Sequence, residues 1–264
     1  MISSVTSKQV KEIVKLQKQP KYRRNQSLFV AEGLKMLTEA AEKGSLVKIY
    51  ISESVMQKKQ GSHIKLYKEY PYETVSDKIF QQISDTVTTQ GILGIVKQPS
   101  YSMESILKDK RHMWILLDGI RDPGNLGTIM RTAEGAGMSA VIMGRGTADL
   151  FNPKTVRSTM GAVFRMPFIY VDDITEIIMQ IRSNGYNVYG TAMEGSIIYD
   201  KADYTKGAGI VIGNEANGIQ DRVLECITGS IRIPMEGKLE SLNAAVSAAV
   251  VMYEAARQKH SMVL

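Results

Sequence analysis

The sequence contains little of what metal sites, disulfides and membrane spans require. A single cysteine, Cys226, in 264 residues excludes an internal disulfide and a cysteine-rich metal site. The three histidines, His63, His112 and His260, are not spaced like metal ligands, so we expect no metal. No apolar run approaches the roughly 20 residues that cross a bilayer, and residues 1–11 lack the apolar centre of a signal peptide. These absences predict a protein of the reducing cytoplasm without a membrane span.

Negative charge is also in deficit, and the deficit is concentrated at one end of the chain. The net charge is +6, and residues 1–30 hold seven cations against one anion, which equals the whole surplus. Such asymmetry favours a polyanion as partner. The cations that we expect to contact a phosphate backbone are Lys8, Lys11, Lys15, Lys18, Arg23 and Arg24. A merely solvated helix face is an equally good interpretation of the four lysines.

The order of the expected elements predicts two domains. Residues 1–97 contain helices at 7–19, at 32–43 and after Ser76, with strands at 46–52 and 92–96, which makes a small α/β unit. Residues 98–110 have weak patterning, contain Pro99, Ser100 and Ser102, and are expected to be a linker. From residue 111 to 264 strands and helices alternate, which is typical of a doubly wound parallel sheet.

The second region is organised around residues 114–137. The apolar run 114–117 predicts a buried strand, a turn follows at 122–124, and Asn125 can cap the next helix. Arg131 lies off the apolar stripe of that helix, so a cation and an amide follow the carboxyl end of a strand, where open α/β sheets bind ligands. The run 135–140 fits G-x-G-x-x-A, but it ends a helix instead of starting one, which argues against a dinucleotide site.

Two later stretches carry further candidate site residues. The run 213–218, Gly-Asn-Glu-Ala-Asn-Gly, follows a buried strand, and its Glu215 needs a partner, for which we expect Arg131. Residues 233–235, Ile-Pro-Met, offer an apolar slot for an adenine ring. Ser241 is expected to cap a helix that runs to about residue 259, whose free N–H groups suit a carboxylate.

These three stretches, in this order, resemble the motifs of the SpoU (TrmH) family of RNA 2′-O-ribose methyltransferases. The first hundred residues, with Tyr-Arg-Arg-Asn-Gln-Ser-Leu-Phe-Val-Ala-Glu-Gly from Tyr22, resemble the family's ribosomal-protein-like RNA-binding domain. The resemblance implies an α/β fold in which residues 111–264 form a parallel-sheet SPOUT domain with a deep trefoil knot. It also implies a homodimer through this domain, for which we expect the alanine-rich face of residues 245–256 to form the interface.

The resemblance also implies site residues. S-adenosylmethionine would be held by Thr191, Ala192, Gly213, Ile233, Met235 and Leu242. The family's functional side chains match Asn125, Arg131, Glu215, Ser241 and Asn243. Lys154 and Arg157 are either ordinary surface cations or additional ligands of RNA phosphate.

The function that we expect is therefore methyl transfer from S-adenosylmethionine to a ribose 2′-hydroxyl of RNA, with 23S ribosomal RNA as the first choice of substrate. A tRNA substrate is the alternative, and a non-catalytic RNA-binding or ribosome-assembly protein is the rival of another class. A guanidinium is a poor base because it stays protonated at neutral pH. We therefore expect Arg131 to bind phosphate and polarise the 2′-oxygen, while the proton acceptor stays open between Arg131, Glu215 and a substrate phosphate.

Overall fold

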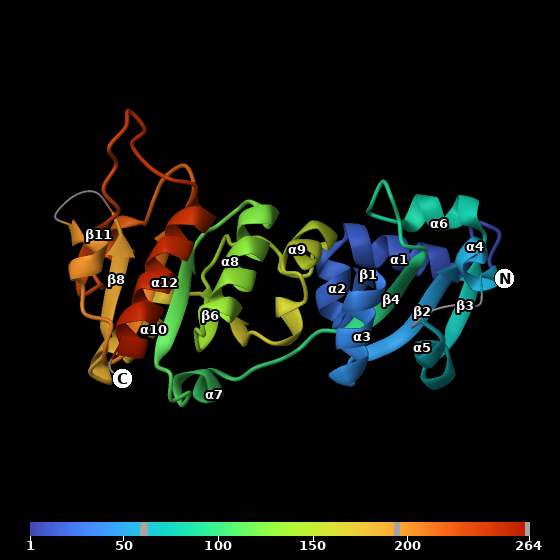
Figure 1. The fold of residues 1–264 in the computed structure, drawn as a ribbon, viewed down its shortest axis with the longest axis horizontal. Coiled ribbons are helices and arrows are strands. Elements are labelled where there is room, and N and C mark those ends of the chain that lie inside the picture. The colour runs from blue at the N-terminus through green and yellow to red at the C-terminus, as the bar shows by residue number, and fades with distance from the viewer. Residues whose placement is uncertain (59–62, 193–195, 262–264) are drawn as a thin grey trace. The chain divides into compact units, whose positions relative to one another are not determined.

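The computed structural model of this chain describes residues 1–58, 63–192 and 196–261. The fold divides into two compact units, Met1–Pro99 with Asp149–Phe164, and Ser100–Ala148 with Arg165–Leu264 (Figure 1). The segment 149–164 was expected in the second domain, yet it groups with the first unit. In chain order the elements that it contains are α9 (Pro153–Ser158) and a 3-10 turn (Ala162–Phe164).

The first unit is a four-stranded sheet covered on both faces. The strand order is β1 (Leu28–Glu32), β4 (Ile92–Lys97), β2 (Leu46–Ser52) and β3 (Tyr72–Val75), and only β2 and β3 run parallel. Helices α1 (Lys8–Lys18) and α6 (Asp77–Ile83) bury apolar side chains against one face. Helix α3 (Leu34–Glu42) lies on the other face, where Leu37 leaves no room for a side chain at Gly94.

The sequence reading of this unit missed several elements. Residue 32 ends β1, so the helix expected at 32–43 begins only at Leu34, after Gly33 with φ 96°. Pro20 ends α1 as expected, but it also starts α2 (Pro20–Gln26), because proline is well accommodated at the first helical position. Strand β1 and the short elements β3, α4 (Glu53–Gln57) and α5 (His63–Glu69) were not foreseen.

Segment 149–164 is held to the first unit by an ion pair and by aromatic contacts. Arg23 is 1% exposed and donates two hydrogen bonds to Asp149 Oδ2, at 3.0 and 2.6 Å. It also donates to the carbonyl oxygens of Leu16 and Gln17. The ring of Phe29 lies 4.9 Å from that of Phe151. Arg23 was expected to contact RNA, and that expectation is wrong because its guanidinium is buried and bonded.

The second unit is a seven-stranded sheet in which every strand pair of the described residues is parallel, as predicted. Its order is β7 (Phe168–Tyr170), β6 (Ala140–Met143), β5 (Met113–Asp118), β10 (Ala208–Gly213), β8 (Asn187–Thr191), β11 (Gly229–Arg232) and β9 (Ile197–Ile198). Every residue of β5 and of β10 is buried, which is why these strands read as continuous apolar runs.

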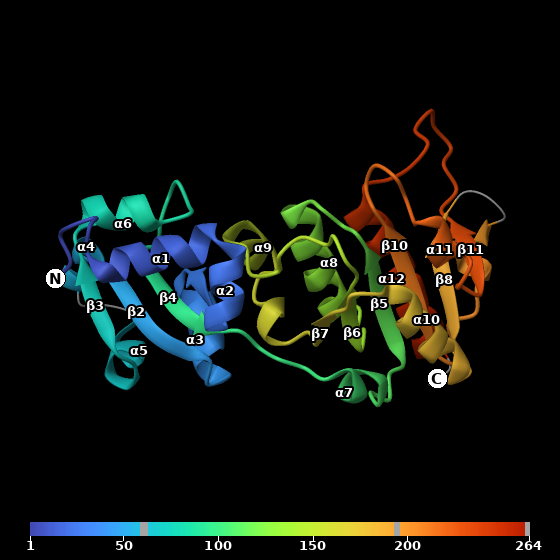
Figure 2. The same ribbon diagram turned by 180° about the vertical axis from the view of Figure 1, so that it is seen from behind.

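Helices cover both faces of this sheet. Helices α8 (Pro123–Gly135) and α12 (Ala244–Ser261) pack side by side on one face (Figure 1). Figure 2 shows the other face, which carries α10 (Ile174–Ser183), α11 (Asp221–Leu224) and α7 (Met103–Leu107). Helix α7 lies in the segment expected to be a linker, and its Ile106 is buried in the core beside Trp114. A further 3-10 turn spans Tyr199–Lys201.

The alanine-rich face of α12 has a different role from the one expected. Ala245, Ala248, Ala255 and Ala256 are buried within the same chain, where small side chains let α12 approach the sheet and α8 closely. The apolar side chains that α12 exposes are Val246 and Tyr253, which are 48% and 55% exposed. In the described residues no helix is both long enough and apolar enough to cross a membrane.

Candidate functional site

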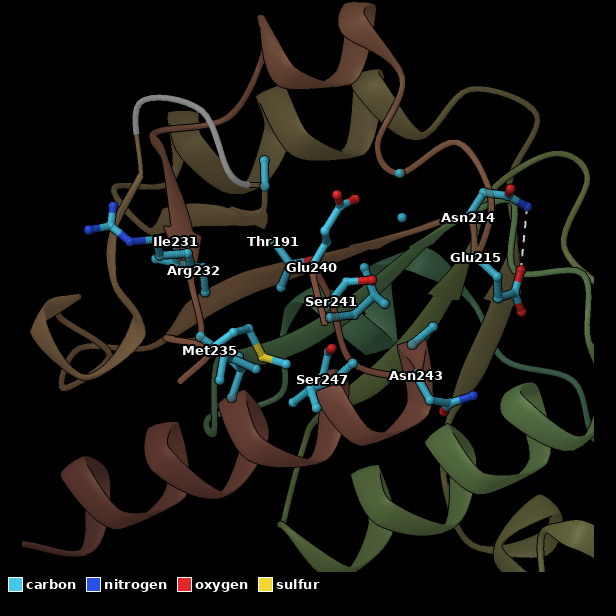
Figure 3. A pocket seen from close by; sticks show the side chains of 18 of the residues that line it. Thr191, Asn214, Glu215, Ile231, Arg232, Met235, Glu240, Ser241, Asn243 and Ser247 are labelled. Carbon is cyan, nitrogen blue, oxygen red and sulfur yellow. Dashed lines mark hydrogen bonds between the residues drawn. The ribbon is translucent and has the colours of Figure 1, made fainter. Parts of the chain in front are cut away.

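The carboxyl ends of β8, β10 and β11 and the start of α12 surround a cavity of about 310 Å³ (Figure 3). Three segments far apart in sequence meet here, as the parallel strand order requires. The cavity lining includes every residue that was expected to hold the cofactor: Thr191, Ala192, Gly213, Ile233, Met235 and Leu242. It also includes Glu215, Ser241 and Asn243, whereas Asn125 and Arg131 are not among the lining residues.

A tight turn closes one wall of this cavity. The main chains of Asn214 and Gly218 exchange two hydrogen bonds, each of 2.9 Å, so the chain folds straight back on itself. A Cβ atom at Gly213 would collide with the main chain of Gly218, and therefore this position requires glycine. The Asn214 side chain ties the turn down, because its Nδ2 donates to Gly119 O at 2.7 Å.

Glu215 does not pair with Arg131, contrary to expectation. Its carboxylate accepts hydrogen bonds from the main-chain N–H groups of Arg121 and Asp122, at 3.1 and 3.2 Å, and from Asn125 Nδ2 at 2.9 Å. A longer bond, of 3.4 Å, comes from Asn214 Nδ2 (Figure 3). Burial raises the pKa of Glu215, but the bonds from Asn125 and the main chain outweigh it, so that the pKa is lowered from 4.5. Glu215 is therefore an ionised anchor for the loop that leads into α8.

Two asparagines extend this network to α12. Asn243 Nδ2 donates to Asn125 Oδ1 at 3.0 Å, and Asn125 Nδ2 donates to Glu215. Asn243 is also the residue that caps α12, because its Oδ1 accepts from the N–H groups of Ala245 and Val246. Likewise Asp122, whose Oδ1 accepts from Asn125 N at 2.8 Å, caps α8. The caps expected at Ser241 and Asn125 are thus wrong, and Asn125 is left free to bridge two motifs.

Arg131 lies on the exposed side of α8, away from the buried residues Leu126, Ile129, Met130 and Ala133, as its position in the sequence predicted. Its guanidinium makes no hydrogen bond and no ion pair with any residue that the structure describes. A cation held on a well-packed helix without a partner in its own chain is free to bind an anionic ligand.

Sequence reasoning missed one buried pair in this region. Asp118, at the end of β5, is 3% exposed and accepts from the main-chain and side-chain nitrogens of Gln220. This pair fixes the far end of the loop that carries Glu215. An aspartate that closes an apolar strand was a visible signal, because a buried carboxylate must be bonded.

The cations that were expected to contact RNA lie in the first unit. Lys8, Lys11, Lys15, Lys18 and Arg24 are exposed, and Lys15 Nζ lies 5.5 Å from the centroid of the Tyr22 ring. Lys154 and Arg157 are exposed on α9, where Arg157 pairs with Asp85. In the parts of the chain that the structure describes, no group of three or more His, Cys, Asp or Glu side chains could hold a metal ion.

Comparisons with known proteins match both units of the chain. Residues 112–253 match the SpoU rRNA Methylase family, and residues 7–94 match the MRM3-like substrate binding domain. The 23S rRNA (guanosine(2553)-2′-O)-methyltransferase RlmP of Bacillus subtilis is 32% identical over 254 residues, which are 96% of this chain and 97% of that protein. The 23S rRNA (guanosine-2′-O-)-methyltransferase RlmB of Xanthomonas axonopodis is 33% identical over 56% of this chain and 60% of its own length.

A solved structure agrees with this assignment. The AdoMet-bound rRNA methyltransferase of Sinorhizobium meliloti superposes with a TM-score of 0.85 at 32% identity, covering 97% of each chain. The sequence matches and the shared two-unit fold point to one family, and the chain belongs to the SpoU rRNA Methylase family.

Proposed function

We propose that this protein transfers a methyl group from S-adenosylmethionine to a ribose 2′-hydroxyl of ribosomal RNA, with 23S rRNA as the substrate. The observation that carries the proposal is the cavity in which residues of the second and third motifs, 213–218 and 233–243, meet the carboxyl end of β8. A full-length relative named as a 23S rRNA 2′-O-methyltransferase, and a structural neighbour described as bound to AdoMet, support the same reaction.

The cavity suits S-adenosylmethionine in size and in chemistry. Its volume of about 310 Å³ falls in the range of small-molecule sites. Ile233, Met235 and Leu242 offer apolar surface for the adenine ring, and Thr191 and Ser241 offer hydroxyl groups for polar atoms. The backbone at Gly213 has no side chain that would keep a ligand away. When bound, the cofactor supplies an electrophilic methyl group on a sulfonium.

We propose separate roles for Arg131 and for the network of Glu215, Asn125 and Asn243 beside the cavity. We assign to Arg131 the binding of the phosphate beside the target nucleotide and the polarisation of the 2′-oxygen, because it is cationic and has no partner among the described residues. Glu215 is a poor proton acceptor because its lowered pKa and its four hydrogen bonds stabilise the ionised form. We therefore assign to Glu215, Asn125 and Asn243 the positioning of the loop before α8.

Ribosomal RNA is preferred over tRNA as the substrate. The full-length relative with this two-unit length is named as a 23S rRNA enzyme, and the first unit matches a substrate binding domain. Exposed lysines at 8, 11, 15 and 18 give that unit a basic surface suited to a phosphate backbone. We propose that Lys154 and Arg157 also bind RNA phosphate. Arg157 forms an ion pair with Asp85 in addition. With 23S rRNA as the substrate, we propose that the reaction takes place in the cytoplasm.

We further propose that the protein is a homodimer through its second unit. The support is the pair of exposed apolar side chains on α12, Val246 and Tyr253, at a spacing of seven residues on one helix face. The buried alanines of the same helix cannot be part of this interface.

Calorimetry and ribose-methylation mapping test the proposed reaction together. We expect the full chain to bind S-adenosylmethionine and the variant Leu242→Trp, which fills the cavity, to lose that binding while keeping its circular dichroism spectrum. A deletion strain should lack one 2′-O-methyl group on 23S rRNA, and the wild-type gene should restore it. Absence of heat with S-adenosylmethionine would favour the non-catalytic ribosome-assembly protein, and a mark lost from tRNA instead would overturn the choice of substrate.

A further inference from the structure

A second cavity, of about 280 Å³, lies wholly within the first unit and has no part in the methyl-transfer site. It is bounded by the junction of β1 and α3, by the loop 84–91, and by α9. Its apolar lining comes from Val30, Met36, Val156 and Met160. Polar side chains of Gln17, Thr88 and Gln90 line the same space, with Lys35 and Arg157 also on its wall.

The loop that forms one wall is held rigid from the inside by Glu32. The Oε1 atom of Glu32 accepts hydrogen bonds from the hydroxyls of Ser84, Thr86 and Thr89, at 2.7, 2.7 and 2.8 Å, and Oε2 accepts from Asp85 N at 3.0 Å. Gln90 Oε1 accepts from Leu34 N at 3.0 Å, which ties the end of the loop to the start of α3. A loop organised in this way loses little entropy when a ligand binds.

The inner bonds leave unused hydrogen-bonding groups at the cavity. Gln17 Nε2 donates to Ile83 O, and Gln90 Oε1 accepts from Leu34 N. The Oε1 atom of Gln17 and the Nε2 atom of Gln90 therefore have no hydrogen bond with any described residue. Thr88 is exposed, and its hydroxyl makes no hydrogen bond with any residue that the structure describes.

We propose that this cavity takes an unpaired nucleobase of the RNA substrate, a subsite that rests on the proposed function. Val30, Met36, Val156 and Met160 give the base an apolar contact, and the free amide and hydroxyl groups of Gln17, Thr88 and Gln90 can bond to its edge. Lys35, exposed and without an ion pair in the described chain, is placed for the adjoining phosphate. Both carboxylates of the lining are engaged within the unit: four donors of the loop bond to Glu32, and Arg157 pairs with Asp85.

The methionines in the lining provide a direct test on the full-length protein. With ¹³C-methyl methionine labelling, we expect the Met36 and Met160 signals to shift when one or more of the four nucleoside 5′-monophosphates are added. Ribose 5-phosphate, which has no base, should leave them unchanged, and Thr88→Trp should abolish the shifts by filling the space. Unchanged signals with all four nucleotides, or equal shifts with ribose 5-phosphate, would overturn the proposal.

A second measurement uses matched pairs of variants and in vitro transcribed 23S rRNA. Thr88→Val and Lys35→Ala should each weaken RNA binding by about 5-fold. Thr38→Val and Lys43→Ala, which remove the same groups from exposed positions of α3 and its end outside the cavity, should bind like the wild type. Variants that match their controls would contradict the proposal. None of the four variants changes the second unit, so each should still bind S-adenosylmethionine. If the variants match their controls while cofactor binding is retained, the nucleobase subsite is wrong but the proposed function is not.

Discussion

At the scale of single residues, the main result is that Glu215, which anchors the loop before α8, and Arg131, which has no partner among the described residues, do not bond to each other. Glu215 and Arg131 were expected to bond to each other, but Glu215 is bonded to Asn125 and to the main chain before α8. The two side chains therefore have independent tasks, one in shaping the loop and one in meeting the substrate. This separation gives each residue its own test.

Removal of Arg131 should impair methyl transfer without impairing cofactor binding. We expect Arg131→Ala to lower single-turnover methyl transfer by on the order of 10²-fold or more, which is the usual effect of losing a charge-stabilising group. Affinity for S-adenosylmethionine, measured by calorimetry, should be unchanged because Arg131 does not line that cavity. Arg131→Lys should rescue only part of the rate, since a point charge cannot make a two-pronged contact. Arg182→Ala, on α10, is the control, and near-normal turnover of Arg131→Ala would refute the assignment.

The lowered pKa of Glu215 gives a prediction about pH. A carboxylate whose pKa is lower in the folded protein stabilises the fold above its ordinary pKa, and this contribution disappears as the pH falls through the lowered value. We expect Glu215→Gln to destabilise the protein at pH 7 by less than about 1 kcal/mol, because the carboxylate is largely exposed. Urea titrations should show the difference shrinking below pH 4.5, whereas Glu225→Gln should have no effect at either pH. A difference independent of pH would contradict this account.

At the scale of elements, α1 and segment 149–164 illustrate how neighbouring cations acquire different roles. The lysines of α1 are exposed on one helix face, but Arg23 in α2 points into the unit and bonds to Asp149. In the sequence, the lysines of α1 and Arg23 belong to the same run of cations. What differs is burial, which turns Arg23 into a structural residue.

The lysines of α1 should account for much of the salt dependence of RNA binding. Replacing Lys8, Lys11, Lys15 and Lys18 by Ala should weaken binding and reduce the slope of log K against log salt by roughly one unit for each lost phosphate contact. Filter binding at several salt concentrations measures the slope. The same number of substitutions at the exposed residues Lys108, Lys110, Lys201 and Lys206 is the control. An unchanged slope in the α1 variant would show a merely solvated helix face.

Loss of the counter-ion of Arg23 should be costly for folding. Asp149→Asn leaves a buried guanidinium without its negative partner, so we expect the free energy of unfolding to fall by roughly 3 kcal/mol. Asp85→Asn removes the partner of Arg157, a pair that is about half exposed, and should reduce stability by less than about 1 kcal/mol. Urea denaturation compares the two variants. Equal losses would mean that burial of the Arg23 pair has no energetic consequence.

At the scale of the whole molecule, assembly depends on the exposed side of α12. Tyr253→Glu should convert the dimer into a monomer in light scattering, because a carboxylate would be buried in an apolar interface. Met179→Glu is the matched control, since Met179 is 52% exposed on α10, on the other face of the sheet. A wild-type mass equal to that of a monomer at all concentrations would contradict the proposed dimer.

The sequence by itself determined the fold class and the list of cofactor-cavity residues. Strands such as β5, which are buried on both faces, are continuous apolar runs, and helices such as α10 show one apolar face, so local pattern was sufficient. The cavity residues were found because the three motifs resemble a family in order and in content. The knot stays a prediction from that resemblance.

Only the tertiary structure decided which groups bond to each other. The bonds of Glu215 to Asn125 and to the main chain before α8, the bond between Asn125 and Asn243, and the burial of Arg23 depend on contacts between residues 90 or more positions apart in sequence. Asp122 and Asn243 cap α8 and α12 because their side-chain oxygens reach the first free N–H groups of these helices. Local sequence shows that a polar side chain needs a partner, but which partner it meets is set by how distant segments pack, and that is a property of the folded chain.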